Sequence, residues 1–125
     1  METLTKTLAQ KNQIKRIALK SGQNYKIFSL DQISTILATD HYSEVICHDQ
    51  RILVDDSLDA IMKRMNAHHF LRVHRSAIIN VNFLTELERQ GDRKFKAILD
   101  DYFSTSVPIS RESLPKLKLR LLLDH

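Results

Sequence analysis

The sequence contains few of the residues that build cross-links and nucleotide loops: one cysteine, two glycines and no tryptophan in 125 residues. The single cysteine, Cys47, excludes a disulfide framework within the chain, so we expect a reducing, cytoplasmic setting. With Gly22 and Gly91 as the only glycines, neither the dinucleotide-binding fingerprint nor the P-loop can be written. No nucleotide cofactor is therefore expected.

The sequence also lacks the long apolar stretch that a membrane span or an export signal requires. No window approaches the roughly 18 to 20 uncharged apolar residues of a membrane helix. Residues 1–20 carry five basic side chains and have no apolar centre of the signal-peptide type. We expect a protein that is not exported and makes no membrane contact through this chain. Its length fits one domain with one core.

Residue groups that could perform catalysis or bind metal are scarce. Cys47 and His48 are adjacent, and neighbours on a strand point to opposite faces, so they do not form a nucleophile and base pair. The histidines at 68, 69 and 74 lack cysteine or carboxylate partners at ligand spacing. The aspartate pairs at 55–56 and 100–101 fit turns or caps better than an acid–base dyad. We expect no enzyme, and no catalytic, cofactor-binding or metal-binding residues.

The net charge of +4 is unevenly distributed along the chain. Residues 1–20 carry +4, residues 21–70 carry −3 and residues 71–125 carry +3. An anionic partner would explain this distribution, and so would simple solubility. If the partner is a nucleic acid, we expect the acidic middle segment to face away from it.

Hydrophobic spacing and turn residues predict a mainly β domain with minor α content over residues 15–123, preceded by a tail or linker at 1–14. The expected hairpins turn at 21–24 and 48–50, the expected helices cover 58–65 and 114–122, and further short strands lie near 70–73, 78–81, 84–88, 95–99 and 107–109. Pro108 indicates an edge strand or the end of a strand, because proline cannot donate to a ladder. Ser110 and Ser113 are both candidate caps for the last helix, and Pro115 favours Ser113 because proline is tolerated only in the first turn.

Three polar segments separate these apolar runs, at residues 40–43, 74–76 and 110–113. Loops carried by a rigid sheet are common sites of recognition. Arg75 and Arg111 can each present a two-pronged donor to guanine or to phosphate, and nearby hydroxyls add weaker bonds. For each arginine, a solvated charge or a helix cap is the alternative interpretation.

Residues 70–80, which read Phe-Leu-Arg-Val-His-Arg-Ser-Ala-Ile-Ile-Asn, resemble the signature segment of LytTR (LytR/AlgR-type) DNA-binding domains. Residues 107–111, with the leucine-rich run that follows, resemble that family's second signature. The resemblance extends from about Arg16 to Leu122. Two positions differ from the family pattern. His41 replaces the usual asparagine, which bears on base preference, and Ala77 replaces an aromatic residue, which bears on packing under the loop.

The resemblance implies an elongated LytTR-type fold of antiparallel β-sheets with one mid-chain helix and a C-terminal helix. It implies a bacterial transcriptional regulator, or a response regulator effector domain, that inserts loops into successive major grooves of double-stranded DNA at direct-repeat sites. A receiver or sensor domain, in cis or in trans, and a second copy on DNA are further expected partners. The implied DNA-binding residues are His41, Tyr42, Ser43, His74, Arg75, Ser76, Ser110 and Arg111. Asn80 is expected to bond local backbone, and His74 either anchors its loop or contacts a base.

Two other function classes remain open at this stage. A protein-interaction module of the same fold would bind a partner through a sheet edge, and scattered positions for Arg72, Arg75 and Arg111 would favour it. An RNA reader usually stacks bases on exposed aromatic side chains. An aromatic content of 6% without tryptophan argues against that class.

Overall fold

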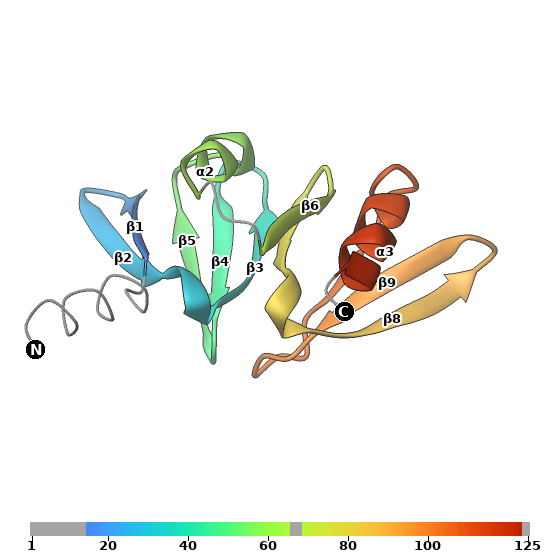
Figure 1. The fold of residues 1–125 in the computed structure, drawn as a ribbon. Helices are drawn as coiled ribbons and strands as arrows, with labels where there is room; N and C mark the ends of the chain where they lie inside the picture. The colour runs from blue at the N-terminus through green and yellow to red at the C-terminus, as the bar shows by residue number, and fades with distance from the viewer. Residues whose placement is uncertain (1–14, 66–68, 124–125) are drawn as a thin grey trace, which may run out of the picture.

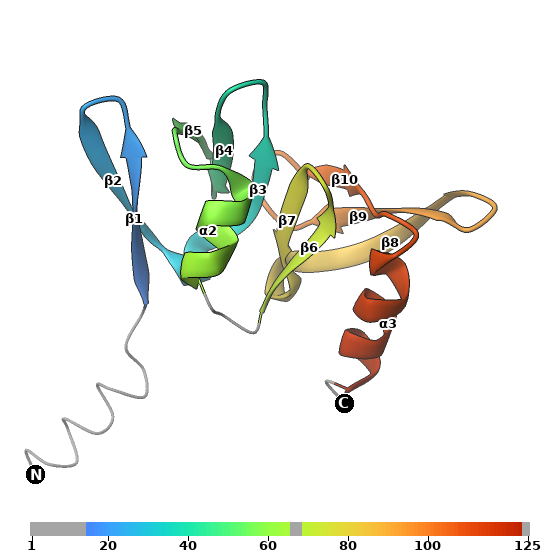
Figure 2. The same ribbon diagram turned by 90° about the horizontal axis from the view of Figure 1, so that it is seen from above.

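The computed structural model describes residues 15–65 and 69–123, so the expected tail at 1–14 lies outside the described residues. The described part folds into short antiparallel strands with two α-helices and two 3-10 turns (Figures 1 and 2). In chain order the elements are β1 (Arg16–Ser21), β2 (Asn24–Ser29), η1 (Leu30–Gln32), β3 (Ile33–Ala38), β4 (Ser43–Cys47), β5 (Gln50–Val54), α2 (Leu58–Met65), β6 (Phe70–His74), β7 (Ala77–Asn80), η2 (Val81–Phe83), β8 (Leu84–Gly91), β9 (Lys94–Leu99), β10 (Ser106–Pro108) and α3 (Ser113–Leu123).

The strands form three antiparallel sheets that follow one another along the long axis of the molecule (Figure 1). The hairpin β1-β2 stands at one end. A five-stranded sheet of order β5-β4-β3-β7-β6 occupies the centre, and a three-stranded sheet of order β10-β9-β8 occupies the other end. The elongated, mainly β fold expected from the sequence is confirmed, and so is the edge position of the strand that contains Pro108.

Local chemistry explains where the first hairpin and the middle helix form. Gly22 adopts a φ of +64° in the β1-β2 turn, in the left-handed region that glycine enters without steric cost. The hydroxyl of Ser57 accepts a hydrogen bond from the backbone N–H of Ala60 at 3.1 Å and so caps α2. Helical spacing then brings Leu58, Ile61 and Met65 onto the buried face of α2.

Two details differ from the sequence-based expectations. The β8-β9 turn lies one residue later than expected, because Gly91 still pairs with Lys94 after a bulge, and Arg93 takes the positive φ of 57°. The cap of α3 is Ser110 rather than Ser113: its side-chain hydroxyl accepts from the backbone N–H of Ser113 at 3.2 Å. Pro115 sits in the first turn of α3, as expected.

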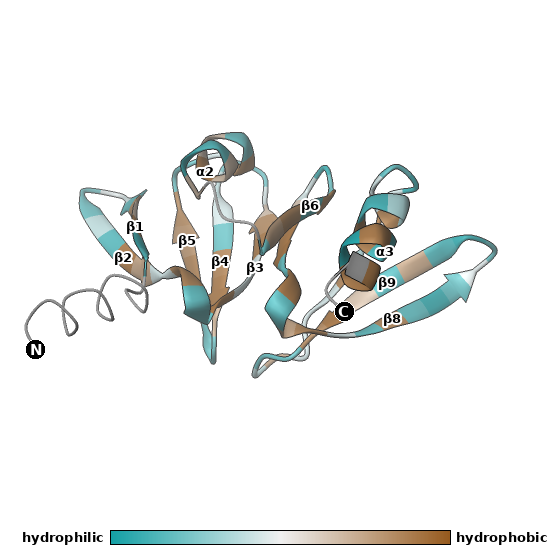
Figure 3. Ribbon diagram, viewed as in Figure 1, coloured by the Kyte–Doolittle hydropathy of each residue, from teal (hydrophilic) through white to brown (hydrophobic). Residues whose placement is uncertain are grey.

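The expected single core is divided in two by the central sheet. Strand β7 shows the division, because Ile78 belongs to one cluster while Ala77 and Ile79 belong to the other. The first cluster lies under α2 and the β1-β2 hairpin, and the second lies between the central sheet, the three-stranded sheet and α3. Figure 3 shows apolar residues gathered along the central strands, while the outer part of β8 is hydrophilic.

Cys47 packs against the first cluster, as its expected role of apolar filler requires. Burial raises the pKa of the Cys47 thiol to about 11. The thiol is therefore protonated at neutral pH.

None of the helices in the described part of the chain is long and apolar enough to cross a membrane.

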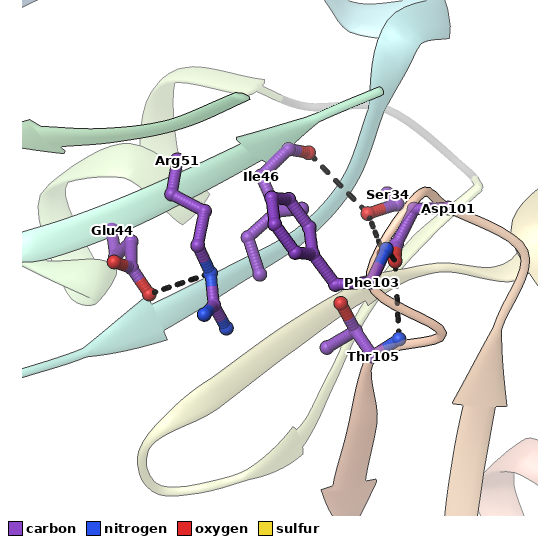
Figure 4. A network of polar contacts seen from close by, with 7 residues as sticks. All are labelled: Ser34, Glu44, Ile46, Arg51, Asp101, Phe103 and Thr105. Carbon is purple, nitrogen blue, oxygen red and sulfur yellow. Dashed lines mark hydrogen bonds and ion pairs between the residues drawn. The ribbon is translucent and has the colours of Figure 1, made fainter. Parts of the chain in front are cut away.

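A network of polar contacts joins the central sheet to the three-stranded sheet at the lower side of the molecule in Figure 1 (Figure 4). The carboxylate of Asp101, in the β9-β10 connection, accepts hydrogen bonds from the Ser34 hydroxyl at 2.7 Å and from the backbone N–H groups of Phe103 and Thr105 at 2.9 and 3.1 Å. The Arg51 guanidinium lies 4.7 Å from the centroid of the Phe103 ring. These contacts hold the two sheets together at their lower ends.

Candidate nucleic-acid interface

The three polar segments become three loops on one side of the molecule, along its upper edge in Figure 1. Loop A, residues 39–42, joins β3 to β4. Loop B, residues 75–76, joins β6 to β7. Loop C, residues 109–112, joins β10 to α3. The first two are borne by the central sheet and the third by the three-stranded sheet, so their relative positions depend on how these sheets are joined.

Main-chain hydrogen bonds connect the three loops to one another. At the base of loop A, the N–H of Ala38 donates to the carbonyl of Ser76 in loop B at 2.9 Å. Strand β6 is an edge strand, and its carbonyls are used by loop C: the N–H of Ser110 donates to the carbonyl of Val73 at 2.7 Å, and the Ser113 hydroxyl donates to the carbonyl of Arg72 at 3.2 Å. The loops therefore form one connected surface.

Two surface depressions lie between the loops. One, of about 300 Å³, is lined by loops A and B and by the start of α2. The other, of about 510 Å³, is lined by loops B and C. Arg72 and Arg75 line both depressions, and Arg111 lines the second. The three arginines are thus gathered on one face and not scattered, which is the arrangement expected of a nucleic-acid reader.

Loop A is a tight turn that projects two ring side chains. The backbone N–H and the hydroxyl of Thr39 both donate to the carbonyl of Tyr42, at 2.8 and 3.0 Å. His41 is exposed, and Tyr42 is 48% exposed. Ser43 differs: it is 1% exposed, and its hydroxyl donates to the carbonyl of Asp56 at 2.6 Å. Its expected DNA contact is therefore unsupported, because that hydroxyl already bonds the chain that leads into α2.

Loop B is held by the imidazole of the residue before it. Nδ1 of His74 accepts from the backbone N–H of Ser76 at 3.2 Å and lies 2.8 Å from the Ser76 hydroxyl. Because Nδ1 is an acceptor, the neutral ring carries its proton on Nε2, which leaves that N–H as a donor. Arg75 is exposed at the tip. His74 therefore has the anchoring role that the sequence left open.

Loop C combines a helix cap with an exposed arginine. Ser110 accepts from the N–H of Ser113, and its hydroxyl lies 2.8 Å from the Ser113 hydroxyl. The Ser110 hydroxyl thus caps α3, and its residue is half-buried. Arg111 and Glu112 are exposed. The expected histidine and serines of loops B and C all bond within the molecule, and the two arginines remain outward.

The acidic middle segment does not face away from this surface, contrary to expectation. Asp55, Asp56 and Asp59 line the depression between loops A and B. Part of that charge is paired: an oxygen of Asp56 lies 3.7 Å from an Arg64 nitrogen, and Asp59 forms an ion pair with Arg72. The expectation failed because α2 begins beside the loops, a placement that charge counting along the sequence does not show.

Asn80 and Arg72 show what sequence reasoning found and what it missed. Asn80 is buried, donates from its side-chain nitrogen to the carbonyl of Ile33 at 2.9 Å and accepts from the N–H of Asn82 at 2.9 Å, so its expected structural role is confirmed.

Arg72 was not among the expected site residues, although it borders both depressions. The available signal was a charged residue inside the apolar run Phe-Leu-Arg-Val.

The described residues, 15–65 and 69–123, contain no group of three His, Cys, Asp or Glu side chains that could hold a metal ion. The linked loops present Arg75 and Arg111 outward on one face, an arrangement that suits a nucleic-acid-binding class of domain. The family model described as LytTr DNA-binding domain matches residues 23–122. The chain belongs to the LytTR DNA-binding domain family, which is a family of DNA-binding domains and not of enzymes.

Several known proteins are similar to this chain. The heme-containing CO-sensing transcriptional regulator RcoM 1 of Paraburkholderia xenovorans is 32% identical over 92 residues, 74% of this chain and 34% of its own length. The sensory transduction protein LytT of Bacillus subtilis is 27% identical over 103 residues, 82% of this chain and 42% of its own length. This chain thus spans between a third and a half of these relatives.

The fold is also found in a solved structure. The LytTr DNA-binding domain of a putative methyl-accepting/DNA response regulator from Bacillus cereus superposes with a TM-score of 0.71. The match covers 85% of this chain and 95% of that one, at 21% sequence identity. At this level of identity, the similarity establishes the shared fold.

Proposed function

We propose that this chain is the sequence-specific double-stranded DNA-binding domain of a bacterial transcriptional regulator. Loops A, B and C would enter successive major grooves at direct-repeat sites. The observation that carries the proposal is that Arg75 and Arg111 are exposed in two turns that are both bonded to β6. In loop B the N–H of Ser76 donates to the imidazole of His74, and in loop C the N–H of Ser110 donates to the carbonyl of Val73. Side chains presented by rigid turns lose little freedom on binding, and this favours base recognition.

The exposed groups suit the chemistry of base edges and phosphates. A guanidinium can donate two parallel hydrogen bonds to O6 and N7 of guanine, which is the commonest specific contact in the major groove. The Nε2 proton of His74 and the rings of His41 and Tyr42 add donors for phosphate oxygens or base acceptors. In this proposal Ser43, Ser76 and Ser110 support the loops and do not read bases.

The β8-β9 ribbon would add phosphate contacts. Residues 89–96 carry four basic side chains and one acidic side chain, so the net charge of +3 for residues 71–125 equals the charge of this short segment. Figure 1 shows the ribbon extending past α3 at the end of the molecule that bears loop C. Basic side chains there would follow the duplex beyond the loops and contribute affinity without sequence information.

The regulatory setting follows from the relatives. Because RcoM 1 and LytT are much longer than this chain and are described as a CO-sensing regulator and a sensory transduction protein, we propose that a receiver or sensor domain, in cis or in trans, controls this domain. Direct-repeat sites would bring two copies together on DNA, with the operator setting their spacing.

The test is a gel-shift titration on a duplex obtained by binding-site selection, against a scrambled duplex, at two salt concentrations. Arg75→Ala and Arg111→Ala should each reduce discrimination by roughly 1 to 3 kcal/mol. Arg16→Ala, which removes an exposed arginine at the opposite end of the molecule, is the matched control and should leave discrimination unchanged.

Equal affinity for all duplexes, with both loop variants indistinguishable from the parent, would refute the assignment of these loops. Displacement of the duplex by single-stranded RNA of the same sequence would instead favour an RNA reader. A protein that binds no nucleic acid at low salt would leave the interaction module as the better account of the fold.

A further inference from the structure

Arg72 makes contacts that link helix α2 to loop B. It lies in β6, three residues before the exposed Arg75. Its Nη1 atom donates to the carboxylate of Asp59 in the first turn of α2, and its Nη2 atom donates to the main-chain carbonyl of Arg75 at 2.6 Å. One guanidinium thus spans from a helix to the turn that carries the proposed base-reading arginine.

We propose that Asp59 and Arg72 are positioning residues for Arg75, and that the guanidinium of Arg72 does not itself bind DNA. The proposal deepens the proposed function and rests on it. Asp59 holds the guanidinium in place, and the guanidinium holds the carbonyl of Arg75. The orientation of the Arg75 peptide, and therefore the direction in which its side chain leaves the turn, is set from α2.

The contacts of Arg72 with Asp59 and Arg75 are better suited to orienting loop B than to stabilising the fold. The Asp59 side chain is 77% exposed, and an ion pair at such a site adds little to the free energy of folding. The Nε atom of Arg72 is buried without a hydrogen-bond partner among the described residues. The guanidinium therefore leaves one buried donor unpaired while both Nη atoms are used, one by the helix and one by the turn.

Two features argue against a direct phosphate contact by Arg72. Its positive charge is already neutralised by Asp59, and Asp55 and Asp56 line the same depression and would repel a phosphate there. Its side chain is also half-buried, whereas Arg75 is exposed. Arg72 meets the carboxylate and the carbonyl with two separate nitrogen atoms of a rigid plane, a geometry that the single nitrogen of a lysine does not reproduce.

The experiment compares Arg72→Gln, Arg72→Lys and Asp59→Asn with the matched control Arg64→Gln. Arg64 lies in α2 and also pairs with an aspartate, Asp56. Arg64→Gln therefore makes the same charge change as Arg72→Gln without touching loop B. Each variant is titrated with the selected and scrambled duplexes over a range of salt. The amide exchange rate of Ser76, whose N–H donates to His74, is measured in the free protein.

Substitutions of Arg72 and of Asp59 should have the same effect on discrimination between the two duplexes. We expect Arg72→Gln, Arg72→Lys and Asp59→Asn each to reduce discrimination roughly five- to tenfold, part of the full loss expected for a base contact. The salt dependence of binding to the scrambled duplex should stay unchanged, and Ser76 should exchange faster. Arg64→Gln should leave discrimination and the Ser76 exchange rate as in the parent.

Three outcomes would overturn the proposal. A salt slope that falls by about 0.9 in Arg72→Gln but not in Asp59→Asn would make Arg72 a phosphate contact. If Arg72→Lys discriminated as well as the parent, a positive charge at position 72 would be sufficient and the guanidinium would not be needed to orient Arg75. If Arg75→Ala itself keeps full discrimination, the proposed function of loop B fails, and the Ser76 exchange rate still decides: unchanged exchange in Arg72→Gln would rule out positioning.

Discussion

The upper and lower ends of the central sheet use charged side chains in opposite ways. At the lower end, Asp101 directs its carboxylate inward and accepts from Ser34 and from two backbone N–H groups (Figure 4). At the upper end, Arg75 and Arg111 project outward, and the bonds that join the loops are made largely by the main chain. The lower end uses the charged side chain of Asp101 for structure, and the upper end leaves the charged side chains of Arg75 and Arg111 available to a ligand.

The comparison shows how the molecule separates stability from recognition. Both ends join the central sheet to the three-stranded sheet: the lower end does so through Asp101, and the upper end through the bonds from Ser110 and Ser113 to β6. Substitutions at the lower end should therefore change the free energy of unfolding. Substitutions of the exposed upper arginines should change DNA binding alone.

The largest expected effect is that of Asp101→Ala. Loss of its three hydrogen bonds leaves a buried hydroxyl and two backbone donors without that acceptor, so we expect the free energy of unfolding to fall by about 2 to 3 kcal/mol. Urea denaturation measures the change. Asp101→Asn, which keeps an acceptor oxygen, should lose less. An unfolding free energy within about 0.5 kcal/mol of the parent in Asp101→Ala would break the comparison.

A smaller effect is expected of Ser110→Ala, which tests an upper side chain that has a structural role. Removing the cap of α3 should cost about 1 kcal/mol of stability. Because loop C starts at this cap, DNA affinity should also fall. Ser106→Ala, at an exposed serine of β10, is the matched control and should change neither quantity. A stable Ser110→Ala protein with parent affinity would show that the main chain alone holds loop C.

The smallest expected effect on stability is that of the ribbon-tip variant Arg93→Asn/Lys94→Gln. Both residues are exposed, and asparagine tolerates the positive φ at position 93, so the unfolding free energy should stay within about 0.5 kcal/mol of the parent. The salt slope of binding should fall by about 0.9 for each side chain that no longer neutralises a phosphate. An unchanged slope would confine the DNA-binding surface to the three loops.

Much of the fold was predictable because it depends on local patterns. The β1-β2 hairpin follows from apolar runs around Gly22, and α2 follows from Ser57 and the spacing of its apolar residues. The strand order was not predictable, since β3 pairs with β7 across more than 35 residues of sequence. The division of the core into two clusters depends on that pairing and was missed with it.

The candidate site was predictable as segments and not as contacts. A polar triplet between apolar runs marked loop B, yet Ser43 has the same composition signal and is buried. The exposure of Ser43 is decided by the chain at Asp56, which its hydroxyl reaches. Arg72 was missed for the same reason, because its partner Asp59 lies 13 residues away on another element.

The main-chain bonds between the loops have a consequence for how base preference can change. The bonds from Ala38 to Ser76 and from Ser110 to Val73 involve backbone atoms only, so they persist whatever side chains stand at positions 41, 75 and 111. If these residues read bases as proposed, new operator preferences would arise by exchanging single side chains on an unaltered frame. Under that proposal the three positions form a compact starting library for selecting domains with altered operators.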